Sequence, residues 1–512
     1  MISEKDVTSA ADILKDSVGE STLSQVLSEE NVYLPLQSWL IKNQSDLASI
    51  TVRVLGTALL QNKTVLRALT AQEDLSPPKP GSQELLDICA ACGLPEVFSG
   101  LSEPENTVPS IEVHWPPFEI PPVFDFQREV IQKGIAAAKT QTASMISLPT
   151  GSGKTRVAAE LIQHFFNEYK DVNYTTIWIA HTEELCEQAI KSINQVISSK
   201  GHQYPYSVIR TWGRFKQKLA RRVRTEELCI AKGDGSHLLV FGTPISVSRL
   251  LDGDSSSPLT NRAKQLDLLV IDEAHRAAAH SYTKTINFAN SQKAAVIGLS
   301  ATPVRATYST QAYKGTKELL RYFPNLIEPT DTLSSASNPE EVLRGMGVLS
   351  ELDIDYISMD RNNTESLAEH ISSLIKKKKI KCSLGFVDTI GTSKALAALL
   401  RHYNIRAESL TADTNNAIRR NAIRQLRAGE IQIIINCELL TTGLDVPAIS
   451  DLFIARQTSS IVLYKQMLGR GLRGPAVGGN ESCNVHLLGV RNNFEQNPST
   501  AQFTKAVWDY HH

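Results

Sequence analysis

The sequence of 512 residues predicts two tandem α/β lobes, each built on a parallel sheet, preceded by a small α-helical domain. From about residue 127 onward, short apolar segments alternate with amphipathic helical segments, which is typical of a parallel sheet covered by helices. This pattern occurs twice along the chain. Before it, segments such as 36–60 and 64–71 lack proline and carry apolar residues at helical spacing. With 42% apolar and 21% charged residues, the composition excludes wholesale disorder.

Proline marks the first boundary. Ten of the 22 prolines lie between residues 77 and 122, where they exclude long helices and favour an extended connection. We therefore expect an acidic α-helical accessory domain at 1–105, a proline-rich linker at 106–122, a first lobe at 123–305, an inter-lobe connection at 306–349 and a second lobe at 350–512.

The expected strands are short apolar runs. In the first lobe they cover residues 143–148, 175–180, 238–241, 268–271 and 295–299, and in the second lobe residues 382–387, 431–436, 452–455 and 484–488. None approaches the ~20 apolar residues of a membrane span, and we expect no signal peptide behind the opening Met-Ile-Ser-Glu-Lys-Asp. Seven scattered cysteines are typical of reduced thiols, so a cytoplasmic location is expected.

The net charge of −1 hides an asymmetry between the two parts of the chain. Residues 1–120 hold 7 basic and 17 acidic side chains, whereas the rest holds 46 basic and 37 acidic ones. The larger part therefore suits a polyanion, and the acidic part repels one. We expect residues 1–120 to dock a protein partner, for which a nuclease is one candidate, or to act as an autoinhibitory module.

A phosphate-binding loop is predicted at residues 148–155, between an apolar strand and a helix. Its glycines let backbone N–H groups converge on a phosphate, and the helix N-terminus adds a positive dipole end. The lysine would reach the β- and γ-phosphates, and the threonine hydroxyl would ligate Mg²⁺. The strict pattern requires glycine at position 148, which is leucine here. The residues expected to line the nucleotide are Gly151, Ser152, Gly153, Lys154 and Thr155.

Two carboxylates follow the apolar strand at 268–271. Asp272 is expected to act on the metal and Glu273 to polarise the attacking water, because strand C-termini are where nucleotide-bound Mg²⁺ is held. A solvated acidic turn that caps the next helix is the alternative.

These motifs resemble those of the superfamily-two helicases and translocases over roughly residues 120–490. Residues 151–155 are similar to motif I of that family, 272–275 to its DEAH-type motif II, and 300–302 to motif III, which couples hydrolysis to nucleic-acid movement. The resemblance implies RecA-like lobes, ATP and Mg²⁺ as cofactors, and nucleic acid as partner, with DNA favoured over RNA.

The same resemblance implies roles for individual residues of the first lobe. Gln127 occupies the place of the adenine-reading glutamine. Residues 179–185 resemble motif Ia and 242–244 motif Ib, which touch the nucleic-acid backbone in relatives. This similarity suggests nucleic-acid contacts by His181, Thr182 and Thr243.

The second lobe carries the remaining motifs. Residues 441–447 resemble motif V, in which the threonine (Thr441) meets nucleic acid and the aspartate (Asp445) lies near the nucleotide. Residues 466–473 resemble motif VI. A guanidinium supplied across the cleft stabilises charge that grows on the γ-phosphoryl group, so Arg470 and Arg473 are the candidate arginine fingers. A pair of surface arginines is the alternative.

Within the superfamily, residues 443–447 and 468–475 look most like the restriction-enzyme helicase subunits and related DNA-repair translocases. The DEAD-box RNA helicases fit less well, because His275 and Met467 stand where they usually carry Asp and Arg. A basic stretch with two aromatics at 210–224 predicts nucleic-acid contacts by Arg210 and Arg214, with a solvated basic helix as the alternative.

The predicted function is an ATP-dependent nucleic-acid helicase or translocase that acts on duplex DNA, in restriction, phage defence or DNA repair. The alternative is an ATP-driven nucleic-acid sensor that switches a partner complex without processive unwinding. No nuclease cluster accompanies the predicted ATPase motifs. Cleavage in such a system would therefore come from a partner.

Overall fold

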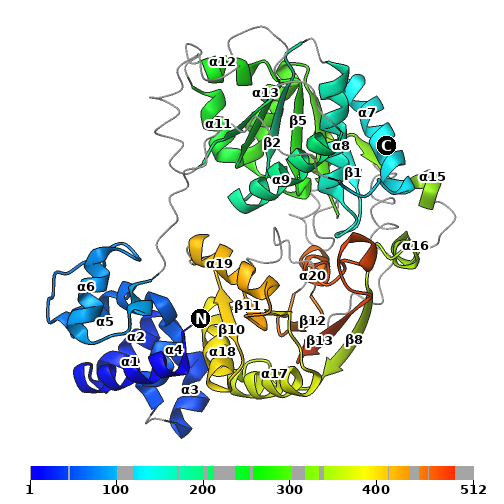
Figure 1. Ribbon diagram of the computed structural model, residues 1–512. Coiled ribbons are helices and arrows are strands. Elements are labelled where there is room, and N and C mark those ends of the chain that lie inside the picture. The colour runs from blue at the N-terminus through cyan, green and yellow to red at the C-terminus, as the bar shows by residue number, and fades with distance from the viewer. Residues whose placement is uncertain are drawn as a thin grey trace.

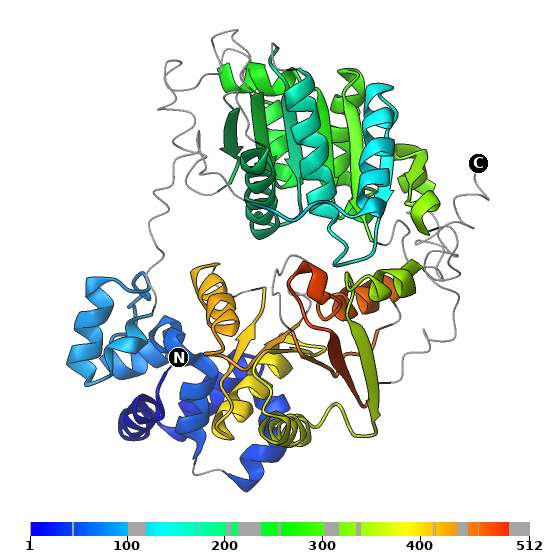
Figure 2. The same ribbon diagram turned by 45° about the vertical axis from the view of Figure 1, so that its right-hand side comes forward.

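The computed structural model describes residues 2–43, 46–100, 119–169, 172–200, 206–212, 237–253, 258–301, 317–333, 339–412, 414, 416–437, 449–458 and 460–490. They form two α/β lobes and a helical unit beside the second lobe, as Figures 1 and 2 show. The predicted fold class is confirmed. No helix of the described segments is both long and apolar enough to cross a membrane.

The first lobe holds a seven-stranded parallel sheet in the order β3-β4-β2-β5-β6-β1-β7. Its strand residues are nearly all buried and mostly apolar, as expected for a sheet covered on both faces. The strands are β1 (Ser144–Ser147), β2 (Thr175–Ile179), β3 (Tyr206–Arg210), β4 (His237–Gly242), β5 (Leu268–Asp272), β6 (Ala295–Ser300) and β7 (Asn325–Ile327). One core lies under α7 (Asp125–Lys139), α8 (Lys154–Glu168) and α9 (Glu183–Ser199); the other lies under α11 (Pro244–Leu251), α12 (Pro258–Lys264) and α13 (His280–Ser291).

The second lobe holds a six-stranded parallel sheet in the order β10-β11-β9-β12-β13-β8. Its strands are β8 (Glu351–Ile357), β9 (Ser383–Phe386), β10 (Ala407–Leu410), β11 (Ile433–Asn436), β12 (Asp451–Ile454) and β13 (Ser482–Leu488). The helices α17 (Thr364–Lys378) and α18 (Ile390–His402) pack on one face, and α19 (Asn416–Arg427) and α20 (Ile461–Leu468) pack on the other.

Four strands were absent from the prediction, and all four are sheet edges: β3 and β7 in the first sheet, β10 and β8 in the second. Edge strands pair on one side only and tolerate polar residues, so they lack the continuous apolar run on which the prediction depended. β8 alternates between exposed and half-buried positions along its length. β7 lies inside the segment expected to connect the lobes, yet it pairs with β1 and extends the first sheet.

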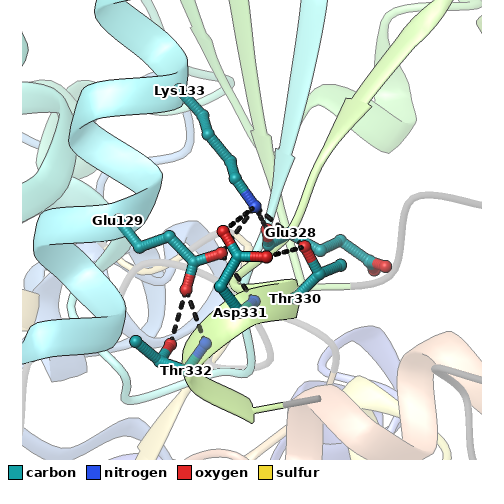
Figure 3. Close-up of polar contacts among 6 residues, drawn as sticks. All are labelled: Glu129, Lys133, Glu328, Thr330, Asp331 and Thr332. Atoms are coloured by element: carbon teal, nitrogen blue, oxygen red, sulfur yellow. Dashed lines mark hydrogen bonds and ion pairs between the residues drawn. The ribbon is translucent and has the colours of Figure 1, made fainter.

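The inter-lobe segment is tied to the first lobe by a polar cluster shown in Figure 3. The carboxylate of Glu129 on α7 accepts hydrogen bonds from the backbone N–H groups of Asp331 and Thr332, at 2.9 and 2.8 Å. It also lies 2.5 Å from Lys133, which donates to Thr330 at 2.8 Å. Burial alone would raise the pKa of Glu129, but these donors lower it to about 2. The start of α15 (Thr330–Leu333) is thereby fixed to α7.

The helical unit comprises α1 (Glu4–Ser17), α2 (Glu20–Glu29), α3 (Tyr33–Lys42), α4 (Leu47–Leu55), α5 (Lys63–Thr70) and α6 (Gln83–Cys92). Its apolar side chains and those of α17 and α18 form one continuous core. Trp39 of the unit meets His402 edge-on, with ring centroids 5.2 Å apart, and Lys42 pairs with Glu365 at 2.9 Å. The helical unit is therefore packed on the second lobe, as Figure 2 shows. The sequence predicted this unit as a separate accessory domain.

Candidate nucleotide site between the lobes

The phosphate loop lies between the end of β1 and the start of α8, as predicted. Gly151 and Gly153 have φ values of 86° and 90°, a left-handed conformation that favours glycine. A Cβ added at Gly153 would also lie 2.5 Å from Nε2 of Gln127. Ser152 is buried and donates from both its N–H and its hydroxyl to the carbonyl oxygen of Pro149. The loop is therefore compact. Glycine suits positions 151 and 153 because the backbone there is left-handed, and at Gly153 a side chain would also meet Gln127.

Lys154 begins α8 and lies at the centre of the site's charges. Its ammonium donates to the carbonyl oxygens of Leu148 and Pro149, each at 3.3 Å. Burial lowers the pKa of Lys154, while the carboxylates of Glu273 and Asp272 oppose that shift. A buried ammonium over a glycine loop at a helix N-terminus fits a phosphate group.

The two carboxylates lie at the C-terminal end of β5. Burial raises the pKa of Asp272, and the neighbouring Glu273 carboxylate raises it further. A divalent cation would relieve this unfavourable burial of negative charge, and oxygen donors of this kind suit Mg²⁺. Thr155 follows Lys154 in the first turn of α8 and is the predicted second ligand. Among the described residues no cluster of three or more His, Cys, Asp or Glu could hold a metal alone, so phosphate oxygens and water would complete the shell.

Glu273 has a distinct environment from Asp272. Burial alone would raise its pKa, but His275, Lys154 and Arg470 lower it, so the carboxylate is favoured in its charged form. Its φ of 50° places the backbone in the left-handed region, which is uncommon for a non-glycine residue. Nδ1 of His275 lies 3.3 Å from the Glu273 carboxylate and 3.3 Å from the hydroxyl of Ser300, at the end of β6. A charged, held carboxylate suits the predicted role of a water-polarising group.

Gln127 joins the phosphate loop to the segment before it. Its Oε1 accepts from the N–H of Phe124 at 3.1 Å, and its Nε2 donates to the carbonyl oxygen of Ser152 at 2.8 Å. The side-chain amide is buried and in contact with the loop. Recognition of adenine by Gln127 stays a prediction.

The second lobe meets the phosphate loop through the turn after α20. A Cβ added at Gly469 would lie 2.5 Å from Cγ2 of Thr150, and one added at Gly151 would lie 3.5 Å from the carbonyl oxygen of Leu472. Arg470, between these contacts, lowers the pKa values of both Lys154 and Glu273. The structure therefore brings Arg470 to the charges of the first lobe across the seam.

Contacts of its backbone fix the position of Arg473. Its carbonyl oxygen accepts from the hydroxyl of Ser350 at 2.7 Å and from the N–H of Asn480 at 3.1 Å, and it forms a bridge with Leu349. These contacts tie the inter-lobe segment to the second lobe. A direct role of Arg473 at the nucleotide stays a prediction.

Two of the predicted nucleic-acid contacts cap helices. Thr182 accepts from the N–H of Leu185 at the start of α9, and Thr243 accepts from the N–H of Ser246 at the start of α11. Both follow the C-terminal ends of strands, on the same edge of the sheet as the phosphate loop. Arg214, Thr441 and Asp445 lie outside the described residues.

Arg210 and His181 interact with charged groups of the first lobe, and contact of either with nucleic acid stays a prediction. Arg210 is buried, and its guanidinium pairs with both carboxylate oxygens of Glu187 at 2.7 and 3.1 Å, so its charge is satisfied inside the lobe. His181 lies among the charges of the nucleotide site. Burial and Arg276 lower its pKa to about 4, and Glu273 opposes the shift.

The structure also reveals an inter-lobe ion pair that the sequence did not suggest. Arg419 of α19 donates to the Glu184 carboxylate of α9 at 2.7 Å, across a separation of 235 residues. Both side chains are partly buried. No spacing or motif could have predicted this pair, because it depends on how the two lobes face each other.

Comparison with known proteins agrees with this arrangement. Residues 121–305 match the family model "Type III restriction enzyme, res subunit", and residues 365–474 match "Helicase conserved C-terminal domain". A candidate ATP-dependent helicase, IRC3 of Saccharomyces cerevisiae, is 25% identical over 70% of this chain and 50% of its own length. A candidate mitochondrial ATP-dependent helicase, irc3 of Schizosaccharomyces pombe, is 26% identical over 64% of this chain and 51% of its own length.

Among solved structures, the ATP-dependent Type ISP restriction-modification enzyme LlaBIII bound to DNA shares the fold. Its TM-score is 0.51 at 15% identity, over 77% of this chain and 30% of that enzyme. This chain spans about half the length of the two fungal relatives. With both family models in order, and with the predicted motifs I, II and VI meeting at one seam, the chain belongs to the superfamily-two helicases and has a first lobe of the type III restriction-enzyme kind.

Proposed function

We propose that this chain hydrolyses ATP with Mg²⁺ and couples hydrolysis to movement along nucleic acid, with duplex DNA as the favoured substrate. One observation carries the proposal: Lys154, Glu273 and Arg470 form a single group of interacting charges, although Arg470 belongs to the other lobe. A site divided in this way is complete only when the lobes meet. ATP hydrolysis would therefore depend on closure of the lobes.

The residues present define the chemistry of each part. Lys154 would bind the β- and γ-phosphates, and Thr155 and Asp272 would hold Mg²⁺, which supplies positive charge to the phosphate oxygens. Glu273 would accept a hydrogen bond from the attacking water and so orient it. Arg470 would stabilise the negative charge that grows on the transferred phosphoryl group.

Nucleic acid would lie across the C-terminal edge of the two sheets. Thr182 and Thr243 stand at that edge in the first lobe, and their backbone N–H groups begin helices, where phosphate binding is favoured. We favour DNA because the first lobe matches a restriction-enzyme subunit, and the restriction-modification enzyme that shares the fold was solved bound to DNA. Restriction, phage defence and DNA repair are the proposed settings.

The test is steady-state ATP hydrolysis with duplex DNA, single-stranded DNA or RNA. We expect stimulation by DNA in the wild type and loss of hydrolysis in Lys154→Ala and Glu273→Gln. Lys377→Ala, an exposed lysine of α17, is the matched control and should hydrolyse ATP as the wild type does. Hydrolysis that persists in both site variants would overturn the proposal.

A nucleic-acid sensor that switches a partner complex is the second candidate, and the acidic helical unit favours it. Displacement of a bound third strand from duplex tracks separates the two candidate functions, since directional displacement requires a motor.

A protein partner of residues 1–120, a nuclease among the candidates, would have to use the face of the helical unit that does not cover α17 and α18. Co-purification with the full chain tests this docking.

A cytoplasmic location is part of the same proposal. It rests on the seven scattered cysteines of the sequence, which are typical of reduced intracellular thiols. The relative from S. pombe carries "mitochondrial" in its name. Fractionation of cells that express the full chain distinguishes the two compartments.

A further inference from the structure

His181 and Glu273 follow the C-terminal ends of the neighbouring strands β2 and β5. β2 pairs in parallel with β5, with Ile179 opposite Ile271. Positions 181 and 273 each lie two residues beyond that last pair, at the same edge of the sheet. Figure 1 shows β2 and β5 side by side in the first lobe.

The charges around His181 come from two parts of the chain. Glu273 and the adjoining His275 and Arg276 lie after β5, and Arg470 approaches from the second lobe. With its own pKa lowered to about 4 by burial first and by Arg276 next, the imidazole is neutral near pH 7. A neutral imidazole carries one N–H donor and one acceptor nitrogen.

Glu273 requires support from its surroundings. Its left-handed backbone is strained, and such conformations persist only where neighbouring contacts hold them. His275 supports the carboxylate from the motif II turn and is itself joined to Ser300. β5 lies between β2 and β6 in the sheet. His181, which follows β2, and Ser300, at the end of β6, therefore lie on opposite sides of β5.

The segment that contains His181 also reaches the second lobe. Thr182 caps α9, which holds residues 183 and 184 in its first turn. Glu184 in that turn pairs with Arg419 of α19 at 2.7 Å. Four consecutive residues, 181–184, therefore run from the neighbourhood of the catalytic carboxylate to an ion pair between the lobes.

We propose that His181 is a positioning residue that holds the Glu273 carboxylate in its working orientation when the lobes close. The Glu184–Arg419 pair sets the position of the 181–184 segment, and the neutral imidazole transmits that position to Glu273. This inference rests on the proposed ATP hydrolysis. It replaces the expectation that His181 contacts nucleic acid.

The test compares His181→Ala and His181→Gln with the wild type in the full-length chain. His280→Ala, an exposed histidine at the start of α13, is the matched control. The measurements are kcat and KM for ATP at saturating duplex DNA, the Kd for a labelled duplex by fluorescence anisotropy, and the thermal unfolding midpoint.

A misplaced catalytic group costs roughly 10- to 100-fold in rate, so kcat of His181→Ala should fall by that factor. The Kd for DNA should change less than about threefold, and His181→Gln, which keeps a neutral donor and acceptor, should recover part of kcat. His280→Ala should match the wild type. Should His181→Ala fail to fold, the intermediate kcat of His181→Gln decides the question.

Two outcomes would overturn the inference alone: an unchanged kcat in the presence of wild-type hydrolysis, or a weaker Kd with kcat restored at saturating DNA. The second outcome would return His181 to nucleic-acid contact. A wild-type chain that fails to hydrolyse ATP would instead overturn the proposed function, and this inference with it.

Discussion

The carboxylate of Glu30, in the helical unit, lies 2.5 Å from the ammonium of Lys394 on α18 of the second lobe. The two residues are 364 positions apart, and both side chains are partly buried. Beside them, the carbonyl oxygen of Asn31 lies against Gly391, and Arg401 donates to the carbonyl oxygen of Arg53. The helical unit is therefore built into the second lobe and should move with it.

Replacement of Trp39 by alanine tests the shared core. Trp39 is 2% exposed and packs against His402, so Trp39→Ala should lower the free energy of unfolding by about 3–5 kcal/mol. Leu34→Ala on the same helix is the control, because Leu34 is 76% exposed and its truncation should change stability by less than about 0.5 kcal/mol. Urea unfolding provides the measurement. Equal stability of both variants would contradict a common core.

Gly391→Ala tests the close approach of the unit to α18. A Cβ at Gly391 would overlap the carbonyl oxygen of Asn31, so the unit should be displaced. With a protease site inserted between residues 101 and 118, the cleaved wild type should keep the unit bound during gel filtration, and Gly391→Ala should release it. Gly345→Ala, which meets no atom within 4 Å, is the control. Retention of the unit in Gly391→Ala would show that the contact is dispensable.

Glu129 makes the inter-lobe attachment sensitive to acid. Its folded-state pKa of about 2 lies below its usual value of 4.5, so the carboxylate stabilises the fold above pH 4.5. That stabilisation should be lost as pH falls from 4.5 toward 2. Glu129→Gln should therefore cost about 1–3 kcal/mol near neutral pH and progressively less below pH 4.5.

Urea unfolding at pH 7 and at pH 3.5 measures this difference. Glu341→Gln, an exposed residue of α16 (Pro339–Gly345), is the control and should change stability little at either pH. A constant penalty for Glu129→Gln at both pH values would refute the linkage.

Arg470 and Arg473 are expected to differ. Arg470 interacts with Lys154 and Glu273 across the seam, so Arg470→Ala should reduce kcat for ATP about 1000-fold or more with a smaller change in nucleotide affinity. Arg473→Ala should reduce kcat less, since Arg470 is the arginine that interacts with both Lys154 and Glu273. Single-turnover hydrolysis and binding of a fluorescent nucleotide separate the two effects. A larger loss in Arg473→Ala would reverse this assignment.

The Glu184–Arg419 pair should favour the closed arrangement of the lobes. Its removal in Arg419→Ala should lower DNA-stimulated kcat roughly two- to fivefold, as expected for an ion pair worth about 0.5–1 kcal/mol. The double exchange Glu184→Arg with Arg419→Glu should restore part of the loss. If the loss of kcat in the double exchange equals the combined losses of the two single changes, the pair has no coupling role.

Local sequence was enough for the central part of the fold and of the site. The predicted interior strands of both sheets appear at the predicted places, because strands buried on both faces are continuous apolar runs. The glycine loop before Lys154 and the carboxylates after β5 were predictable for a similar reason. Their chemistry depends on neighbours in the chain, which place backbone N–H groups and carboxylates at the end of a strand.

Tertiary structure alone decided which distant residues meet. The edge strands, the packing of residues 2–100 on α17 and α18, the burial of Arg210 against Glu187, and the Glu184–Arg419 pair depend on contacts between segments separated by tens to hundreds of residues. The burial and the charged neighbours of His181 and Arg210 are properties of those contacts. The sequence by itself determined the chemical groups of the nucleotide site, and the folded chain determined which of them act on one another.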